Sequence, residues 1–351
     1  MLTPLFDSFL QHTLFPPANF KPTTITLSTG ISITHKDIGV LEVAPANAQH
    51  SVVISSGIHG DETAPIELVD DLVSNILNEE VVPTERVLFI IAHPDAVHAH
   101  TRFIEENLNR LFSTKNAERN EECIIANRLQ GHVSDFFNAN DLNATKWHFD
   151  LHSAIRESKH YMFGVVPAST SATDIRPLVA FIQSAQMDAL LLSRTPSSTF
   201  SWWTAENFEA LAATFEMGRV ARLFENDMTE FYPLKSALVA LITKKPASTV
   251  NDGRPFSIYK VTRTLTKTDA NFRLAFSNDA ANFTHFAAGE KLAEEGHISY
   301  SAIKGGEAVV FPNANVALGQ RACLLVQPYA PDLSVPLFVN IDAEPGPIAT
   351  S

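Results

Sequence analysis

The stretch SVVISSGIHGDETAPIELVDDLVSNIL, residues 51–77, places a short apolar run directly before a polar turn and a helical pattern. The run is rich in valine and isoleucine, which is typical of a strand buried on both faces of a sheet. After the turn, apolar side chains recur at the spacing of one helix face, at Ile66, Val69, Leu72, Val73 and Ile76. The stretch therefore predicts a β-strand that leads into an α-helix, the unit from which α/β folds are built.

The same alternation continues to about residue 244. Further strands are predicted at residues 86–93, 147–153, 189–194 and 211–218. Helices are predicted at residues 121–137, 175–187 and 227–244, the last with a proline inside its first half. Two β-rich runs within residues 23–35 predict a hairpin at a sheet edge. Strands that alternate with helices predict an α/β fold, with a mixed sheet covered by helices on both faces.

The pattern changes between Lys244 and Pro255, a segment rich in turn-forming residues. Beyond it, helical periodicity largely stops, and short strands are separated by glycine, asparagine and proline. We therefore predict a larger α/β domain over residues 1–249 and a smaller β-rich C-terminal domain over residues 250–351.

Charge and cysteine content exclude several classes of protein. With 26 Lys and Arg against 39 Asp and Glu, the formal charge is −13, so nucleic acid and anionic membranes are poor partners. Cys123 and Cys323 form neither a disulfide framework nor a cysteine-based zinc module. There is no basic segment of a secretory signal and no run of about 18 apolar residues. These features predict a soluble cytoplasmic protein and leave a homo-oligomer open.

His59 and Glu62 form an H-x-x-E pair where the first strand gives way to its helix. Residues three apart on the first helical turn can converge on one ion, and histidine nitrogen and carboxylate oxygen suit zinc. The alternative is a polar loop with a helix cap. The pair alone is weak evidence for a metal, because H-x-x-E often arises by chance.

The strand at residues 147–153 carries His148, Asp150 and His152 on one face, because strand side chains alternate with a period of two. Three ionisable groups on a buried face are costly unless they have partners. The alternatives are a solvated face or satisfied core histidines. His152 lies at the carboxyl end of the strand, where α/β folds bind ligands, and is the predicted third metal ligand. Asp150 is expected to orient a ligand, as carboxylates near metal-bound histidines do.

Glu216 follows a run of small apolar residues near the end of another predicted strand. A buried, unpaired carboxylate there would cost several kcal/mol. The alternatives are an ion pair with Arg219 or simple exposure. The functional hypothesis is a general base for a water molecule activated by the metal.

The segment HTRFIEENLNRLF, residues 100–112, brackets Arg102, Asn109 and Arg110 with apolar side chains. Arginine beside aromatic residues in an acidic protein suggests carboxylate recognition, because its planar fork matches two oxygens. The alternative is a pair of surface arginines bound to Glu105 and Glu106.

Taken in order, GIHGDETAP (57–65), TRFIEENLNRLF (101–112), DLHSAIR (150–156) and TFEMG (214–218) resemble the succinylglutamate desuccinylase and aspartoacylase family. This family is a branch of the zinc carboxypeptidase-like hydrolases. VVFPNANVALGQRACLLV (309–326) extends the similarity into the C-terminal part, so it covers essentially the whole chain.

The resemblance implies a zinc carboxypeptidase-like fold with one Zn²⁺ held by His59, Glu62 and His152. It implies that Glu216 is the general base and proton shuttle and that Arg102 polarises the scissile carbonyl. Asn109 and Arg110 match the Asn-Arg pair that holds a substrate carboxylate in the family.

The resemblance also implies hydrolysis of N2-succinylglutamate to succinate and glutamate, in the succinyl route of arginine breakdown. This small anionic substrate has three carboxylates, so local arginines must bind it, and Arg156 with Lys159 is a further candidate pair. The alternatives are an aspartoacylase-like deacylase of another N-acyl amino acid and a catalytically inactive metabolite-binding relative. Peptidase activity is a weaker option, because the C-terminal domain should restrict entry of long chains.

Overall fold

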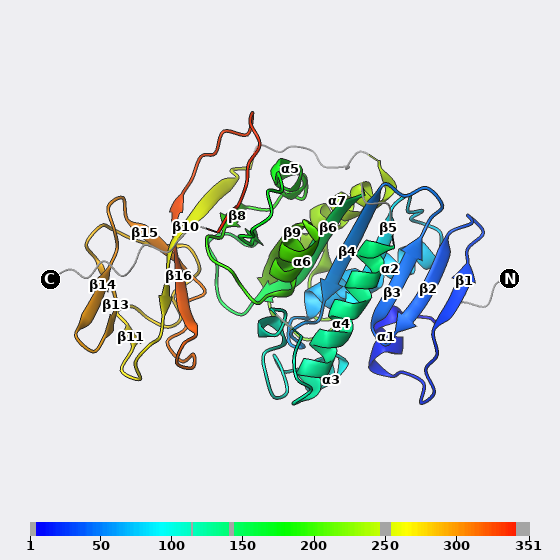
Figure 1. Cartoon of the computed structure of the whole chain (residues 1–351), viewed down its shortest axis with the longest axis horizontal. Helices are drawn as coiled ribbons and strands as arrows, with labels where there is room; N and C mark the ends of the chain where they lie inside the picture. Colours follow the sequence, from blue (N-terminus) through cyan, green and yellow to red (C-terminus); the bar gives the residue numbers. More distant parts are fainter. Residues whose placement is uncertain (1–4, 114, 140–143, 246–253, 342–351) are drawn as a thin grey trace.

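A computed structural model describes residues 5–113, 115–139, 144–245 and 254–341, and its main element is a mixed sheet of 13 strands (Figure 1). In spatial order the large sheet consists of β1 (Thr23–Thr26), β2 (Ser32–Asp37), β3 (Val40–Ala44), β5 (Arg86–Ile91), β4 (His50–Ser56), β6 (Thr145–Ala154), β9 (Leu211–Arg219), β7 (Met162–Val166), β8 (Ala189–Leu192), β10 (Ser257–Thr266), β16 (Arg321–Pro328), β15 (Glu307–Val310) and β12 (Thr284–Phe286). A second sheet consists of β11 (Arg273–Leu274), β13 (Lys291–Glu295) and β14 (Ile298–Ser301).

Helices cover both faces of the first nine strands. They are α1 (Phe9–Leu14), α2 (Thr63–Leu77), α3 (Pro94–Ala99), α4 (Glu121–Asn138), α5 (Arg176–Ser184), α6 (Phe200–Phe208) and α7 (Tyr232–Thr243), with 3₁₀ turns at Leu108–Arg110 and Met228–Phe231. Side chains alternate between two cores: Val52 and Ile54 pack with α1, α2, α5 and α7, whereas Val53 packs with α4 and α6. The predicted mixed sheet between two helical layers is therefore confirmed.

The sheet changes direction in the way that the sequence pattern predicts. β1, β2 and β3 are antiparallel, which confirms the hairpin at the edge. β5, β4, β6 and β9 are mutually parallel, so their carboxyl ends meet at one edge of the sheet. Because α/β sheets bind ligands beyond these ends, that edge is where a site is expected.

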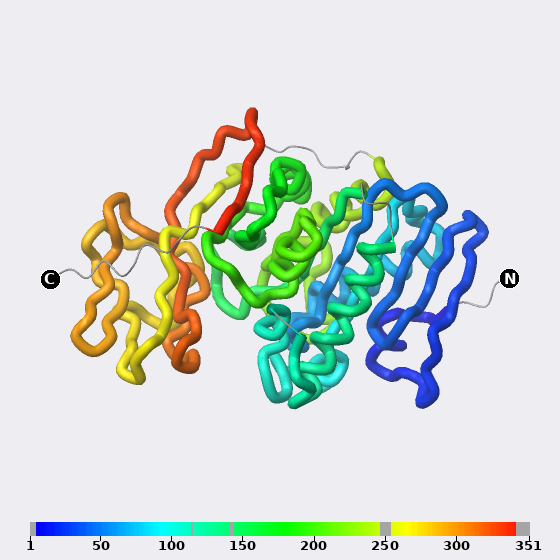
Figure 2. Tube along the Cα trace, in the orientation of Figure 1, coloured from blue at the N-terminus to red at the C-terminus, as the bar shows by residue number. Residues whose placement is uncertain are grey.

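The C-terminal strands continue the same sheet. β10 pairs with β8 in parallel, and β16, β15 and β12 follow it in antiparallel order. The β-rich character expected after residue 250 is confirmed, although the boundary itself falls at residues 246–253, outside the described residues. After β16 the chain returns to the larger part, where Leu337 O accepts from Ile175 N at 2.9 Å; Figure 2 shows this red segment beside the green one.

The helix expected at residues 227–244 begins later than predicted. Residues 228–231 form a 3₁₀ turn, and α7 begins at Tyr232, which places Pro233 in the first helical turn. Proline is tolerated there because the first N–H groups of a helix have no intrahelical partner. No helix within the described ranges combines the length and apolar character needed to cross a bilayer.

Candidate active site

The loop between β4 and α2 places His59 and Glu62 at the carboxyl edge of the sheet. Gly60 allows a close approach, since a Cβ there would lie 2.0 Å from the backbone carbon of Ala96. Glu62 is the N-cap residue of α2, but its side chain makes no capping hydrogen bond. It turns towards His59 instead, so the helix-cap alternative is wrong. Both residues are 2% exposed.

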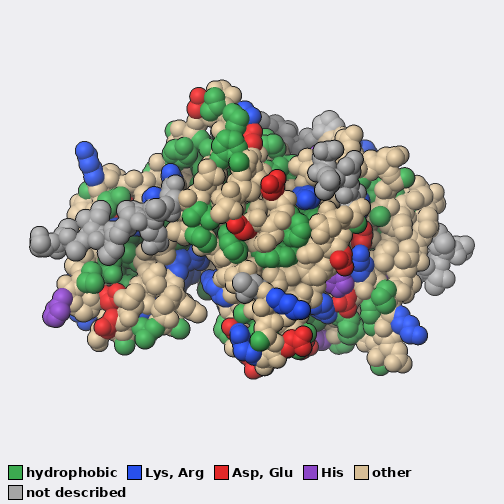
Figure 3. Space-filling model, in the orientation of Figure 1, with side chains coloured by type: hydrophobic (Ala, Val, Ile, Leu, Met, Phe, Trp, Pro, Cys, Tyr) green, Lys and Arg blue, Asp and Glu red, His purple; other side chains and the backbone are tan. Residues whose placement is uncertain are grey.

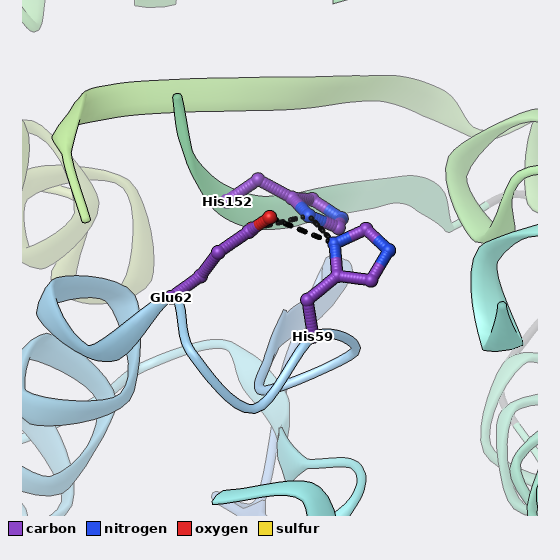
Figure 4. Close-up of side chains that lie close together, drawn as sticks. All are labelled: His59, Glu62 and His152. Carbon is purple, nitrogen blue, oxygen red and sulfur yellow. Dashed lines mark hydrogen bonds and ion pairs between the residues drawn. The ribbon is translucent and has the colours of Figure 1, made fainter. Parts of the chain in front are cut away.

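His152, from the end of β6, meets His59 and Glu62 at one point (Figure 4). His59 Nδ1 lies 2.8 Å from Glu62 Oε1, His152 Nδ1 lies 2.8 Å from Glu62 Oε2, and the two Nδ1 atoms are 3.2 Å apart. One ligand atom from each residue lies within 4.8 Å of the others. The three residues predicted as metal ligands therefore come together.

The far nitrogens of both histidines face oxygen atoms. His59 Nε2 lies 3.0 Å from Asn107 Oδ1, and His152 Nε2 lies 3.0 Å from Asp150 Oδ2. Histidines that bind a metal donate their other N–H to such oxygens, which leaves the lone pair of the near nitrogen for the ion. Asp150 thus occupies the orienting position expected from the sequence. Asn107 was missed, although it lies in the same polar segment as Asn109.

The charges of the surrounding side chains also favour a cation at this point. Although burial acts against it, Asp150 and Glu62 raise the pKa of His152 well above 6.5. In the same way, His59 and His152 lower the pKa of Glu62 well below 4.5 despite its burial. Without an ion, a proton on His152 thus supplies the positive charge that the carboxylates require. Two imidazole nitrogens and one carboxylate form a donor set that suits zinc and leaves room for water or substrate.

His148 is a satisfied core histidine, which was one alternative for this strand. Its two ring nitrogens contact Ser55 Oγ at 2.9 Å and Thr204 Oγ1 at 2.8 Å. Burial lowers the pKa of His148 to about 4, so the ring is neutral near pH 7. Ser55 also donates to Asp150 Oδ1 at 2.7 Å, so His148 belongs to the structure that supports Asp150.

Glu216 lies beside the cluster because β6 and β9 pair in parallel with His152 opposite Glu216. Among the described residues, none donates a hydrogen bond to its carboxylate. Arg219 pairs with Glu157 instead, so the ion-pair alternative is wrong. Burial and the nearby Glu62 raise the pKa of Glu216 to about 7. A carboxylate with such a pKa can take and give a proton near neutrality.

This elevated pKa predicts that Glu216 destabilises the metal-free protein at alkaline pH. The folded state binds its proton more tightly than the unfolded state, so stability falls as pH rises from 4.5 to about 7. Since one pKa unit is worth about 1.4 kcal/mol, the upper limit is about 3 kcal/mol. We expect Glu216→Gln to raise the free energy of unfolding of chelator-treated protein at pH 8 and hardly at pH 4.5. Urea unfolding at both pH values measures this, and equal stabilities at pH 8 would contradict it.

The segment that leads into the first 3₁₀ turn brings Arg102 into the cluster, and the turn itself brings Asn109. Arg102 Nη1 donates to Glu62 Oε1 at 2.6 Å. Asn109 Nδ2 lies 3.3 Å from His152 Nε2, and its Oδ1 accepts from Phe200 N at 3.0 Å. Glu106 pairs with Arg119 instead. The alternative in which these arginines pair with Glu105 and Glu106 is therefore wrong.

Arg110 and Arg156 have no carboxylate partner among the described residues. Within the described part of the chain, Arg110 donates only to the neighbouring carbonyl of Asn109, at 2.9 Å. Arg156 follows His152 by four residues, in a loop that contacts the C-terminal strands where Lys159 N donates to Asn282 O at 3.1 Å. His160 Nε2 lies 2.9 Å from the Tyr259 hydroxyl and takes no part in the cluster.

Comparison with known families covers most of the chain. Residues 48–242 match the succinylglutamate desuccinylase/aspartoacylase catalytic domain. Residues 254–329 match the AstE/AspA barrel-sandwich hybrid domain.

Individual relatives agree with these matches. The chain is 44% identical over 323 residues to a protein named succinylglutamate desuccinylase from Vibrio vulnificus, which covers 91% of this chain and 94% of that protein. A crystal structure of the protein of that name from Vibrio parahaemolyticus is 42% identical, with a TM-score of 0.86. The match covers 93% of this chain and 96% of that one. Murine aminoacylase 3, at 16% identity and a TM-score of 0.56 over 81% and 97% of the two chains, shares the fold.

Proposed function

Because the chain belongs to the succinylglutamate desuccinylase/aspartoacylase family, we propose that it is a zinc-dependent hydrolase that cleaves N2-succinylglutamate into succinate and glutamate, in the succinyl route of arginine breakdown. The observation that carries the proposal is the convergence of His59, Glu62 and His152 beside Glu216. The 44% identity to a protein named for this substrate supports the choice among acyl groups.

His59, Glu62 and His152 would hold the ion. When bound, zinc supplies Lewis acidity, which lowers the pKa of water and polarises a carbonyl. The chain's own residues keep the ligands in place: Asp150 and Asn107 fix the ring orientations, and Ser153 N donates to Glu62 Oε2 at 3.0 Å. This preorganisation avoids rearrangement during the reaction.

Glu216 is the proton carrier in the proposed reaction. Its carboxylate accepts a proton from the attacking water as the C–O bond to the succinyl carbonyl forms. The guanidinium of Arg102 stabilises the negative charge that develops on the carbonyl oxygen. As the C–N bond breaks, Glu216 passes the proton to the leaving nitrogen of glutamate. A pKa of about 7 in the metal-free protein suits both transfers.

Recognition of three substrate carboxylates must come from local cations, because the chain as a whole carries −13. Arg110 is the candidate for one carboxylate, since it has no acidic partner among the described residues. Asn109 uses its side chain on His152 and Phe200 N, so it supports the position of Arg110 in this proposal. Arg156 is the candidate for a second carboxylate.

We expect Arg156→Ala to raise KM for N2-succinylglutamate about 10-fold or more with little change in kcat, because the side chain would bind ground and transition states alike. Steady-state kinetics measure this. An unchanged KM removes Arg156 from the substrate pocket.

The other candidate function within the family is hydrolysis of a different N-acyl amino acid. Assays of N2-succinylglutamate and N-acetylaspartate, combined with elemental analysis of the purified protein, distinguish the two. Faster turnover of N-acetylaspartate would overturn the proposed substrate. Zinc binding without turnover of any acyl amino acid would instead favour the inactive metabolite-binding relative.

A further inference from the structure

Arg321, the first residue of β16, is half-buried and has no anionic partner among the described residues. Its guanidinium lies over the ring of Phe311, 5.5 Å from the centroid. Within the described ranges no group accepts a hydrogen bond from it. By contrast Arg263, on the adjacent strand β10, is bound to Glu307 at 2.6 Å. The missing partner of Arg321 is therefore a local feature, since another arginine of these strands is paired.

Packing connects Arg321 to the candidate active site. Phe311 packs against Phe163, with ring centroids 5.8 Å apart. Phe163 lies on β7 directly opposite Glu216 on β9. Two phenylalanine rings thus lead from the strand of the proton carrier to the guanidinium. When a guanidinium lies on an aromatic face, its N–H groups point outward in the guanidinium plane and remain available to an anion.

Asn282 fixes the position of Phe311 relative to the loop that follows His152. Its Oδ1 accepts from Phe311 N at 2.8 Å, while its own backbone N donates to Glu157 O at 2.8 Å. Asn282 is 1% exposed. One buried residue therefore connects the end of β15, where Phe311 lies, to the loop after β6, which limits movement of the ring that supports Arg321.

Electrostatics indicate that three arginines share this region. Desolvation together with Arg321 and Arg102 lowers the pKa of Arg110 to about 10, so Arg110 stays charged near pH 7. Burial lowers the pKa of Arg321, although Cys323 and Glu216 act in the opposite direction. In Figure 3, Lys and Arg side chains lie on both sides of the notch between the C-terminal strands and the rest of the molecule. Arg102 is paired with Glu62, whereas Arg110 and Arg321 have no carboxylate partner among the described residues, and unpaired positive charge of this kind is suited to an anionic ligand.

We propose that Arg321 binds a carboxylate on the amino-acid side of the substrate and so makes the C-terminal strands part of the specificity pocket. The assignment to this side follows from Glu216, which must reach the leaving nitrogen to protonate it. The α-carboxylate lies two bonds from that nitrogen, so a cation on the Glu216 side of the site meets the leaving group rather than the distal end of the acyl chain. The inference rests on the proposed function in that it requires an N-acyl amino acid as substrate.

The test compares Arg321→Gln with wild type on N2-succinylglutamate and on three analogues that each lack one carboxylate. These are N-succinyl-γ-aminobutyrate, which lacks the α-carboxylate, N-succinyl-2-aminobutyrate, which lacks the γ-carboxylate, and N-butyrylglutamate, which lacks the acyl one. We expect kcat/KM for the full substrate to fall at least ~30-fold, mainly through KM. For either N-succinyl-γ-aminobutyrate or N-succinyl-2-aminobutyrate, the loss of kcat/KM in Arg321→Gln should shrink to about 3-fold or less. The analogue that shows this lacks the carboxylate that Arg321 binds, so removing the arginine costs little more.

An equal loss on all three analogues would indicate a structural role and overturn the inference. A loss that shrinks only for N-butyrylglutamate would place Arg321 at the acyl end, which also overturns it. Wild-type inactivity on N2-succinylglutamate would instead overturn the proposed function, and the same comparison would then use the N-acyl amino acid hydrolysed fastest and its analogues.

Three further variants control for folding. Arg273→Gln removes an exposed arginine of the second sheet, paired with Glu294, and should leave kcat/KM unchanged. Phe311→Leu removes the ring beneath the guanidinium and should give a smaller rise in KM with the same dependence on the analogues. Should Arg321→Gln fail to fold, Arg321→Lys keeps the charge without the planar fork, and a loss with the same analogue dependence supports the inference. Unchanged kinetics in Arg321→Lys and Phe311→Leu would overturn it.

Discussion

Glu216→Ala should lower kcat by about 10²- to 10⁴-fold while the protein still binds one metal ion per chain. The carboxylate lies opposite His152 but outside the group of ligand atoms, so its removal leaves all three candidate ligands in place. The variant loses proton transfer by the carboxylate, which lowers the energy of the transition state and not that of the bound substrate. The decrease in kcat should therefore be larger than the change in KM. Steady-state kinetics and elemental analysis of the same preparation measure both quantities.

The exposed Glu118 provides a matched control, since Glu118→Ala removes a carboxylate with no role in the cluster and should leave kcat unchanged.

Wild-type activity should also fall as pH decreases, because a protonated Glu216 cannot act as a base. A bound cation would lower the pKa of Glu216 and so place this fall in activity below pH 7. Loss of the metal together with activity in Glu216→Ala would show that Glu216 is a ligand. A fall in kcat of less than about 10-fold would assign the base role to another group.

Sequence predicts the parts of this fold that depend on local pattern. The strand at 51–56 and the helix that follows it are specified by apolar spacing within one stretch, and β4 with α2 confirms them. Around Pro233 the structure has a 3₁₀ turn followed by a shorter helix where one helix over residues 227–244 was predicted. Periodicity alone does not locate the first turn of a helix. Helix α6 was missed, although Thr199 caps it by accepting from Trp202 N, because its polar and apolar residues follow no clear stripe.

Long-range pairing explains what the sequence leaves open in the site. His152 and Glu216 are strand partners although β7 and β8 lie between them in the chain, and no local pattern specifies that order. The choice between ligand and core histidine at His148 depended on Thr204 of α6, which supplies its second hydrogen bond. Arg321 was quoted only as part of a similar segment, because its position near Glu216 follows from the pairing of β10 with β8.

His152→Ala should abolish both metal binding and hydrolysis. His152 supplies one of three candidate ligand atoms, and two remaining protein ligands do not complete a tetrahedral zinc site with one open position. We expect metal content to fall from one ion per chain towards zero after dialysis, and activity to fall to the level of chelator-treated wild type. Elemental analysis and the N2-succinylglutamate assay measure the two effects, and His297→Ala, an exposed histidine, is the matched control.

A graded series separates the ligand from the residue that orients it. Asp150→Asn keeps the shape of the side chain next to His152 Nε2 but removes its charge, and such changes weaken metal binding by about 10- to 100-fold. His152→Ala must weaken binding by more than Asp150→Asn, because it removes the donor atom itself. If His152→Ala kept its metal while Asp150→Asn lost it, the carboxylate of Asp150 would be the true ligand. The third donor of the proposed metal site would then be Asp150 and not His152.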